Sequence, residues 1–424
     1  MPDKNEMRGM SNFLEESVIR EKINRRRPNE DDRYKENGEN VDRLSDLPDD
    51  VLLHVLSFLN TQHVVQTCVL STRWKYLWKL IPTLILHSSS FSTKKHFARF
   101  LSKILTLRDS LAKLHTLDFV HHGDIESRLL KKILSGVSSH NTHLQKIGIN
   151  VRVDTCIILS CVSSCRALTS LKLSLYPKSC YNFSETLFPN SLNFPELTSL
   201  DLTNFVFCGG GNGCVAPFLA FNKLNSLIIH RCTVRDAQIL HISSETLVNL
   251  TMHDNSFNIG KIELSTPNLH IFTFRGIPGQ LMYGSGLSSV KLVSIDALMY
   301  SNDRIPPLVL FTWLLEFANL KSLTVSSTTL QVLSLIPDLL EVEHLSLCNL
   351  KSMEIKLQSS YLLGLSDVLK EAMVKKVAAK SRKEATKLRK AFDKGLQPPF
   401  IPDGIVDFLL QNSPSAKVNI TTIY

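Results

Sequence analysis

The sequence predicts an α/β fold: a short three-helix module, then a solenoid with a curved parallel β-sheet, then a C-terminal helical cap. Three observations predict it, namely helical apolar spacing over 41–82, a short leucine pattern that recurs over 83–363, and a basic amphipathic segment within 364–424. We expect about ten irregular repeats in the solenoid and a charged, disordered tail over residues 1–40.

The composition is that of a folded protein. The 424 residues are 43% hydrophobic and 21% charged, which excludes a chain that is disordered throughout. The N-terminal stretch has no apolar core typical of a secretory signal, and no apolar run reaches the ~18 residues of a membrane span. The nine cysteines, an odd number without an export signal, indicate reduced thiols. We therefore expect a soluble protein of the nucleus or the cytoplasm that has no membrane partner.

The tail carries almost balanced charge. Its nine basic and ten acidic residues, with few apolar side chains between them, favour a solvated segment. Arg25, Arg26 and Arg27 also leave open a nuclear-import signal, although a run of three basic residues is a weak one.

The first helix of the module is predicted from its start signals. Pro48 suits the first helical position, and the carboxylates of Asp49 and Asp50 favour the positive end of the helix dipole. Apolar residues then follow at helical spacing: Val51, Leu52, Val55, Leu56 and Leu59.

Two shorter helices follow in the module. Thr61 is the expected N-cap of the second helix, Ser71 caps the third, and Pro82 ends it. The third helix carries Trp74 and Trp78. Three helices in roughly 45 residues lie near the lower size limit for independent stability. The module must therefore pack its large apolar content against the following domain or another protein.

Two motifs in this module resemble an F-box: Leu47-Pro48-Asp49-Asp50, and the segment from Leu70 to Trp78 that reads LSTRWKYLW. The Pro-Thr-Lys often found between the first two helices is Asn-Thr-Gln here, at residues 60–62. The resemblance implies docking on the Skp adaptor of SCF ubiquitin ligases through Leu47, Pro48, Asp50, Val51, Val69, Leu70 and Trp74. Alternatively, apolar side chains of the module only hold its own helices together, which we favour for Val55, Leu56 and Trp78.

The middle of the chain repeats the pattern Leu-x-x-Leu-x-Leu or an apolar variant. Successive matches begin 18 to 33 residues apart, which brackets the ~20–29 residue period of leucine-rich repeats. Thr83 to Leu86 is the expected edge strand, and the segment from Ser127 to Ser135 is helical or irregular on the convex side. The matches begin at Leu114, Leu144, Leu168, Leu197, Leu224, Leu247, Leu269, Leu287, Leu320 and Val342.

Residues next to the strand leucines should form the concave face of the solenoid, because side chains alternate between the two faces of a strand. This row is small, polar and of mixed charge, which suits protein recognition better than tracking of phosphates. Target-binding candidates are Lys146, Lys172, Asp201, Thr251, Lys291 and Ser346. The alternatives are a solvated face without a partner and recognition by loops at the repeat edges.

The C-terminal part is basic. Ten basic and four acidic residues lie in 366–394, with Leu369, Met373 and Val377 among the apolar residues expected on one helical face. A charged helix face at the end of the solenoid is favoured over nucleic-acid binding. The segment 401–410 resembles the C-terminal part of plant F-box/leucine-rich-repeat proteins and predicts a capping helix, with a strand around Val418 and Ile420.

Catalytic and metal-binding patterns are weak. His140, His143, Cys156, Cys161 and Cys165 lack the paired Cys-x-x-Cys spacing of a zinc site. The Gly-rich run at 209–213 lacks the Gly-Lys-Ser/Thr of a phosphate-binding loop. We expect no cofactor, no metal and no enzymatic activity in this chain.

The resemblance therefore implies a substrate-recognition subunit of an SCF-type (Skp–cullin–F-box) ubiquitin ligase. The F-box would dock on the Skp adaptor, and through it on the cullin and RING subunits, while the solenoid would bind a target protein. Two alternatives remain open at this point: a scaffold that does not direct degradation, and a nucleic-acid-associated factor that uses the basic C-terminal helix.

Overall fold

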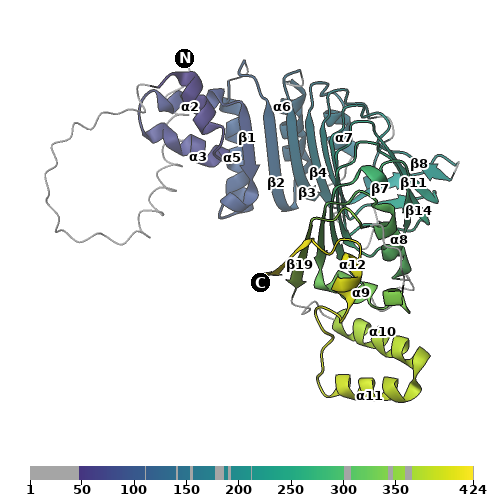
Figure 1. Ribbon diagram of the computed structural model, residues 1–424. Coiled ribbons are helices and arrows are strands. Elements are labelled where there is room, and N and C mark those ends of the chain that lie inside the picture. Colours follow the sequence, from purple (N-terminus) through teal and green to yellow (C-terminus); the bar gives the residue numbers. More distant parts are fainter. Residues whose placement is uncertain are drawn as a thin grey trace, which may run out of the picture. The chain divides into compact units, whose positions relative to one another are not determined.

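The computed structural model describes residues 47–109, 111–139, 142–152, 156–176, 186–189, 192–211, 213–299, 307–341, 347–358 and 365–423 (Figure 1). These residues form two compact units. The first contains the described chain up to Leu86 together with 106–114, and the second contains 87–105 and everything after 115. The expected tail over 1–40 lies outside the described residues.

The first unit is built from short helices. They are α2 (Asp49–Leu56), α3 (Thr61–Gln66), the 3-10 turn η1 (Thr67–Val69), α4 (Trp74–Leu77) and the 3-10 turn η2 (Trp78–Leu80), and most of the strand β1 (Thr83–His87) follows. Their core contains apolar side chains that are at most 6% exposed: Leu52, Leu56, Val64, Val65, Trp74, Leu77, Trp78 and Ile81.

Two predicted caps of this unit are corrected by the structure. Pro48 has an extended ψ of 151° and is the N-cap of α2, so the helix begins one residue later than expected. The N-cap of α3 is Asn60, whose side chain accepts a hydrogen bond from the His63 amide, and not Thr61. Thr61 is buried instead, and its hydroxyl accepts a hydrogen bond from the Ile85 amide at 2.9 Å. Thr61 therefore joins the second helix to β1 rather than starting the helix.

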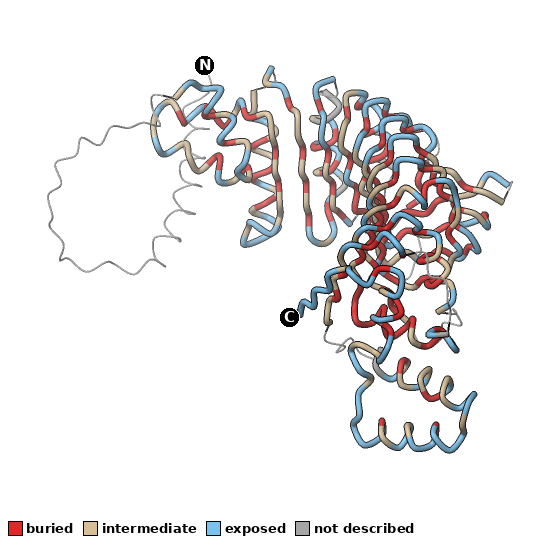
Figure 2. The backbone as a smooth tube through the Cα atoms, viewed as in Figure 1, coloured by how far each residue is buried: buried red, intermediate tan, exposed pale blue. Residues whose placement is uncertain are grey.

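The second unit is a solenoid around one long parallel sheet. Strands that are separated by a whole repeat in the sequence are neighbours in the sheet, so equivalent leucines line up in one buried row. In this unit the strand order is β2 (Thr116–Asp124), β3 (Lys146–Arg152), β4 (Ser170–Tyr176), β6 (Ser199–Thr203), β9 (Ser226–His230), β12 (Asn249–His253), β15 (Ile271–Gly276), β17 (Leu292–Ala297), β18 (Ser322–Ser326), β19 (Ser352–Gln358) and β20 (Lys417–Ile423). Figure 2 shows the buried positions alternating along these strands.

The back of the solenoid is closed in two ways. At both ends helices cover it: α5 (Lys94–Leu107), α6 (Ser127–Ser139), α7 (Cys156–Val162), α8 (Leu308–Glu316) and α9 (Ser327–Leu333). In the middle, two smaller parallel sheets replace the helices. Their strands are β5 (Thr186–Leu187), β7 (Phe205–Cys208), β10 (Thr233–Arg235) and β13 (Ser256–Phe257), and β8 (Cys214–Val215), β11 (Ile239–Ser243), β14 (Lys261–Ser265) and β16 (Leu281–Tyr283).

The sharp corners of the middle repeats depend on left-handed backbone. Asn204, Arg231 and Asp254 have φ values of 64°, 50° and 49°, and each follows a strand of the main sheet. Their amides donate to the carbonyls of the next repeat, at His230, His253 and Arg275. These corners turn the chain from the main sheet into a back strand without a helix.

One predicted repeat is corrected, and another begins outside the described residues. The eighth match was assigned to Leu287, Val290 and Leu292, but β17 buries Val293 and Ile295 and leaves Leu292 exposed. The repeat is therefore Val290-x-x-Val293-x-Ile295, three residues later than predicted. The tenth match began at Val342, and 342–346 lies outside the described residues. The strand that pairs with β18 is β19, which buries Met353 and Ile355.

The basic C-terminal segment forms two helices, not the single helix expected. They are α10 (Leu365–Lys380) and α11 (Arg382–Asp393). Ser381 separates them, because its hydroxyl accepts a hydrogen bond from the Glu384 amide and so caps a new helix. The pair has its own apolar core of Val374, Ala385 and Phe392, flanked by Met373, Val377 and Leu388. The last elements are α12 (Ile405–Leu410) and β20, where the sequence predicts a capping helix and a strand.

Candidate protein-interaction surfaces

Exposed apolar side chains are concentrated in the first unit. Of twenty large hydrophobic residues that are exposed in the described part of the chain, eight lie within 51–80. They are Val51, Val55, Phe58, Leu59, Val69, Leu70, Tyr76 and Leu80. Isolated exposed leucines are common on soluble proteins, but such a concentration in thirty residues is typical of a surface that binds another protein. We call these eight residues the apolar surface of the helical unit.

Helix α2 supplies this surface because it carries two apolar stripes. Leu52 and Leu56 are four residues apart, face inward and are at most 1% exposed. Val51 and Val55 are shifted by one residue, face outward and are 42% and 46% exposed. Phe58 continues this outer stripe just beyond the helix and is 72% exposed, with its ring edge-on to His54 at 5.0 Å between centroids. One face of α2 therefore builds the core, and the neighbouring face is left for a partner.

An arginine fixes the two motifs of the module to each other. The Arg73 guanidinium pairs with the Asp49 carboxylate, with 2.8 Å between Nε and Oδ1, and it also donates to the Leu47 carbonyl. These groups lie 24 and 26 residues apart in sequence. The start of α4 is thereby held against the start of α2. This contact gives a physical reason why the Leu-Pro-Asp and Ser-Thr-Arg-Trp motifs occur together.

The structure separates the predicted adaptor-contacting residues into two groups. Leu47 is half-buried, whereas Pro48, Asp50, Val51, Val69 and Leu70 are exposed and available to a partner. Trp74 is only 6% exposed and packs inside the module, so its contact with an adaptor stays a prediction. Val55 is the converse case, because it was expected in the core and is exposed. Leu56 and Trp78 are buried, as the packing alternative expects.

Four residues of the apolar surface are not among the predicted contact residues: Phe58, Leu59, Tyr76 and Leu80. The outer stripe of α2 is a detectable signal for the first two, since it continues from Val51 and Val55 at helical spacing. The Tyr76 ring has lysine neighbours, with the Lys75 and Lys79 ammonium nitrogens 5.8 and 5.6 Å from its centroid. The apolar surface thus has acidic residues at the start of α2 and basic residues beside α4.

The second candidate surface is the outer face of the main sheet, on the side opposite the buried leucine row. Lys172 and Asp201 are direct neighbours across β4 and β6, and their Nζ and Oδ2 atoms form an ion pair at 3.0 Å. Thr251 follows in the same row two strands later, whereas Lys146 lies one row over, opposite Ser170. The structure therefore places these four predicted residues on the same face of the main sheet.

Of the two remaining predicted residues, one precedes its strand and the other lies outside the described residues. Lys291 precedes β17, and Ser294 occupies the row position beside Thr273. The Lys291 Nζ lies 3.0 Å from the His270 Nε2. Ser346 lies outside the described residues.

A charged cluster on the same face was not predicted. His230, His253, Arg275 and Asp296 are register neighbours at the C-terminal ends of β9, β12, β15 and β17. Arg275 Nε lies 3.5 Å from Asp296 Oδ2 and 4.0 Å from the carboxylate of Asp254, which is 3.5 Å from His230 Nε2. Burial lowers the pKa of His253, and the neighbouring His230 lowers it further. The sequence marks these four residues by their position, because each directly follows the last apolar residue of its repeat pattern.

Neither surface carries the residues of a metal site. Within the described residues no group of three His, Cys, Asp or Glu side chains is placed to hold a metal ion. Burial raises the pKa of the Cys165 thiol to about 11, which opposes formation of a thiolate ligand. No helix in the described ranges is both long and apolar enough to cross a membrane. The arrangement can bind macromolecules through an apolar helical face and through a polar sheet face.

The chain is similar to known F-box proteins. Residues 44–85 match the F-box domain family. An FBD-associated F-box protein of Arabidopsis thaliana is 26% identical over 341 residues, which are 76% of this chain and 73% of the relative. An F-box/FBD/LRR-repeat protein of the same plant is 24% identical over 285 residues, 62% of each chain. An F-box/LRR-repeat protein of this plant is 27% identical over 323 residues, 70% of this chain and 80% of the relative. The match to a further relative from this plant spans only half of that relative.

Proposed function

We propose that this chain, which carries an F-box domain and resembles plant F-box/leucine-rich-repeat proteins, is the substrate-recognition subunit of an SCF-type ubiquitin ligase. In this proposal the F-box docks on a Skp-family adaptor and the solenoid binds the target protein. The observation that carries it is the apolar surface of the helical unit, which coincides with the matched F-box segment.

The composition of this surface supports docking on helices of a partner. Valine, leucine and phenylalanine side chains that remain 39–72% exposed gain about 25 cal/mol for each Å² of apolar area that a partner covers. Their spacing along α2 matches the i, i+4, i+7 pattern of an apolar helix face that fits a hydrophobic groove. The Asp49–Arg73 pair holds the two halves of the surface in place before binding, which lowers the entropy that docking has to overcome.

The solenoid supports selective binding of a target. Its outer face offers paired charges and hydroxyls rather than a continuous apolar patch, as at Lys172 and Asp201 and in the cluster around Arg275. Buried or half-buried polar groups discriminate between partners, because a wrong partner leaves them unpaired. We assign target recognition to this face, with the cluster of His230, His253, Arg275 and Asp296 as its central part.

The two surfaces together would act through proximity. A target held on the solenoid is presented to transfer machinery that is attached through the adaptor, so transfer of ubiquitin to a target lysine becomes effectively intramolecular. The thioester chemistry belongs to the other subunits. The described chain supplies binding and orientation only.

Reconstitution tests this proposal. The full-length chain is mixed with purified Skp adaptor, cullin and RING subunits, and ubiquitin transfer to a partner identified by proximity labelling is followed. We expect transfer with the intact chain and none with a form in which Val51 and Phe58 are both changed to Asp. A partner that binds but receives no ubiquitin in the complete assembly would favour the scaffold alternative and contradict the ligase function.

A further inference from the structure

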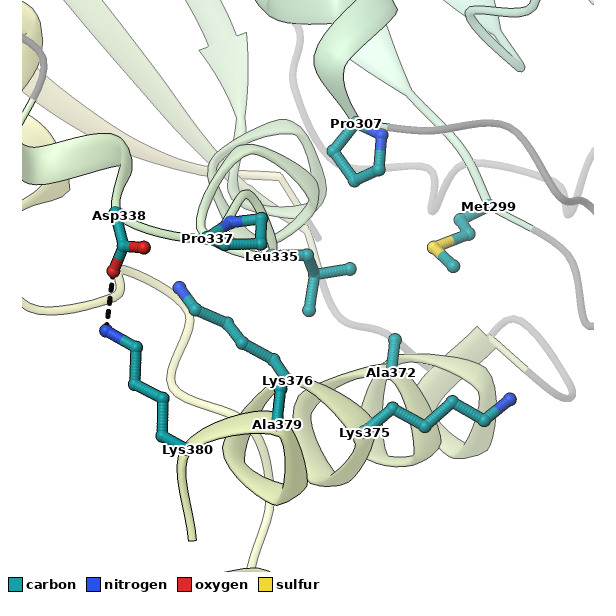
Figure 3. Close-up of a pocket in the computed structure, with 10 residues that line it drawn as sticks. All are labelled: Met299, Pro307, Leu335, Pro337, Asp338, Ala372, Lys375, Lys376, Ala379 and Lys380. Carbon is teal, nitrogen blue, oxygen red and sulfur yellow. Dashed lines mark hydrogen bonds and ion pairs between the residues drawn. The ribbon is translucent and has the colours of Figure 1, made fainter.

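A cavity of about 420 Å³ lies between α10 and the end of the solenoid, within the second unit (Figure 3). Most of its wall is apolar, formed by Met299, Pro307, Leu335, Pro337, Ala372 and Ala379. Figure 3 shows Ala372 facing the gap below Leu335, Pro307 and Met299. The volume falls within the range of small-molecule sites, roughly 300–1,000 Å³.

Four charged residues complete the lining, and three of them are lysines. Lys380 forms an ion pair with Asp338, at 2.6 Å between Nζ and Oδ1. Lys376 donates to the carbonyl of Ser334 at the end of α9, which is a neutral partner. Lys375 has no ion pair among the described residues. Figure 3 shows Lys376 and Lys380 reaching up one side of the gap, with Lys375 at the other side.

The lining therefore has an excess of positive charge beside an apolar wall. One carboxylate faces three ammonium groups. Burial lowers the pKa of Lys376, and the nearby Lys380 lowers it further. The charged form of Lys376 is therefore less favourable than that of a lysine in water. Hydrogen bonding from Lys380 lowers the pKa of Asp338, which keeps that carboxylate ionised but already engaged with Lys380. A second negative charge in the cavity would offset the remaining excess.

We propose that this cavity binds a small organic anion, in which a carboxylate is carried on a compact apolar body. The carboxylate would lie beside the Lys376 ammonium group, and the apolar body would cover Met299, Leu335 and Ala372. The apolar wall disfavours a bare inorganic anion, and the limited volume disfavours a folded protein segment. The inference does not depend on the F-box docking on an adaptor, so it can fail or succeed separately from the proposed function.

The test uses a matched pair of compounds. Binding of 4-phenylbutyrate and of its uncharged analogue 4-phenyl-1-butanol to the full-length chain is measured by titration calorimetry. We expect saturable binding of the acid with a dissociation constant of about 1 mM or tighter, and at least about tenfold weaker binding of the alcohol. Equal affinity for both compounds, or no saturable binding of the acid, would overturn the proposal.

Three variants locate the site. Lys375→Met combined with Lys376→Met removes the two lining ammonium groups that form no ion pair among the described residues, and it should weaken binding of the acid at least about tenfold. Ala372→Phe fills the cavity and should abolish binding of the acid. Lys387→Met, which removes an exposed lysine of α11 outside the cavity, is the control and should bind like the unmodified chain. Unchanged binding of the acid by both Ala372→Phe and the double lysine variant would contradict the assignment to this cavity.

Discussion

The helical unit, which contains the matched F-box segment, and the outer face of the main sheet expose opposite kinds of side chain. In the helical unit, eight large apolar residues are exposed within thirty residues. On the sheet face, hydroxyls and paired charges alternate with the buried leucines, and the exposed neighbours Ile271 and Leu292 are an apolar exception. An apolar surface of fixed shape suits one invariant partner, whereas a row of polar residues can differ at every repeat and suits a selected partner.

The repeats also differ from one another in the structure that forms the back of the solenoid. Repeats that begin about 30 residues apart, as from Leu114 to Leu144, have room for the helix α6. Repeats 22 to 23 residues apart, from Leu224 to Leu269, turn through Arg231 or Asp254 into short back strands. The structure of the back therefore differs between repeats, and not by length alone, since the 24-residue repeat from Leu144 to Leu168 carries the helix α7. The leucine pattern keeps the front sheet the same throughout.

The largest expected effect is on adaptor binding. Val51→Asp together with Phe58→Asp should weaken binding of the Skp adaptor by about 1,000-fold or more, because two charges would be buried without partners at the interface. Residue 51 lies in the first turn of α2, where an acidic side chain is compatible with the helix dipole, so the unit should stay folded. Binding is measured by calorimetry with the full-length chain.

Leu219→Asp is the matched control for this variant. Leu219 is 57% exposed in the solenoid, so the substitution removes an apolar side chain of comparable exposure outside the F-box. We expect unchanged adaptor binding. Loss of binding in the control, or full binding in the double variant, would show that the apolar surface is not the docking site.

Neighbouring residues of α2 separate folding from binding. Leu52→Ala should lower the free energy of unfolding by about 3 kcal/mol, because it leaves a cavity in the module core. Val51→Ala should change stability by less than about 0.5 kcal/mol and should still weaken the adaptor complex. Denaturant unfolding followed by tryptophan fluorescence distinguishes the two, since Trp74 and Trp78 lie in this core. A similar loss of stability for both variants would refute the two-stripe description of α2.

A smaller effect is expected on the solenoid face. Arg275→Ala removes the guanidinium that lies between two carboxylates and should weaken target capture by about tenfold, with no change in adaptor binding. Lys223→Ala, which breaks the exposed pair with Glu196, is the control and should capture the target normally. The readout is the amount of partner recovered by proximity labelling. Equal recovery with Arg275→Ala would exclude the cluster from the recognition surface.

The smallest effect concerns pH. Burial lowers the pKa of His253 below its ordinary value of 6.5, so between that lowered pKa and 6.5 the unfolded chain binds more protons than the folded one. Stability should therefore fall as the pH drops below about 6.5. Burial also lowers the pKa of His121, which contributes in the same direction. Thermal melts at pH 7.5 and 5.5 should show a fall of a few degrees that His253→Gln reduces but does not abolish.

Much of this organisation could be predicted from the sequence. The Leu-Pro-Asp and Ser-Thr-Arg-Trp motifs identified the helical module, and the leucine pattern identified the parallel sheet. Both signals are local and periodic. Arg73 shows why the first is reliable: the contact with Asp49 requires both motifs at once.

The remaining features depend on contacts that periodicity does not encode. Leu287, Val290 and Val293 are each three residues apart, so the eighth repeat fits the pattern in two registers, and only packing selects the later one. Val55 is exposed, against expectation, because both stripes of α2 are apolar and the pattern does not show which one faces the core. The back strands are two to five residues long, which is too short for a detectable alternation.

Hydrogen exchange of the full-length chain, with and without the Skp adaptor, tests the central proposal most directly. We predict that the adaptor slows amide exchange within Asp49–Leu80, most strongly along α2, and leaves the strands of the main sheet unchanged. Slowed exchange confined to the solenoid, or identical exchange in the F-box segment under saturating adaptor, would contradict docking through the apolar surface.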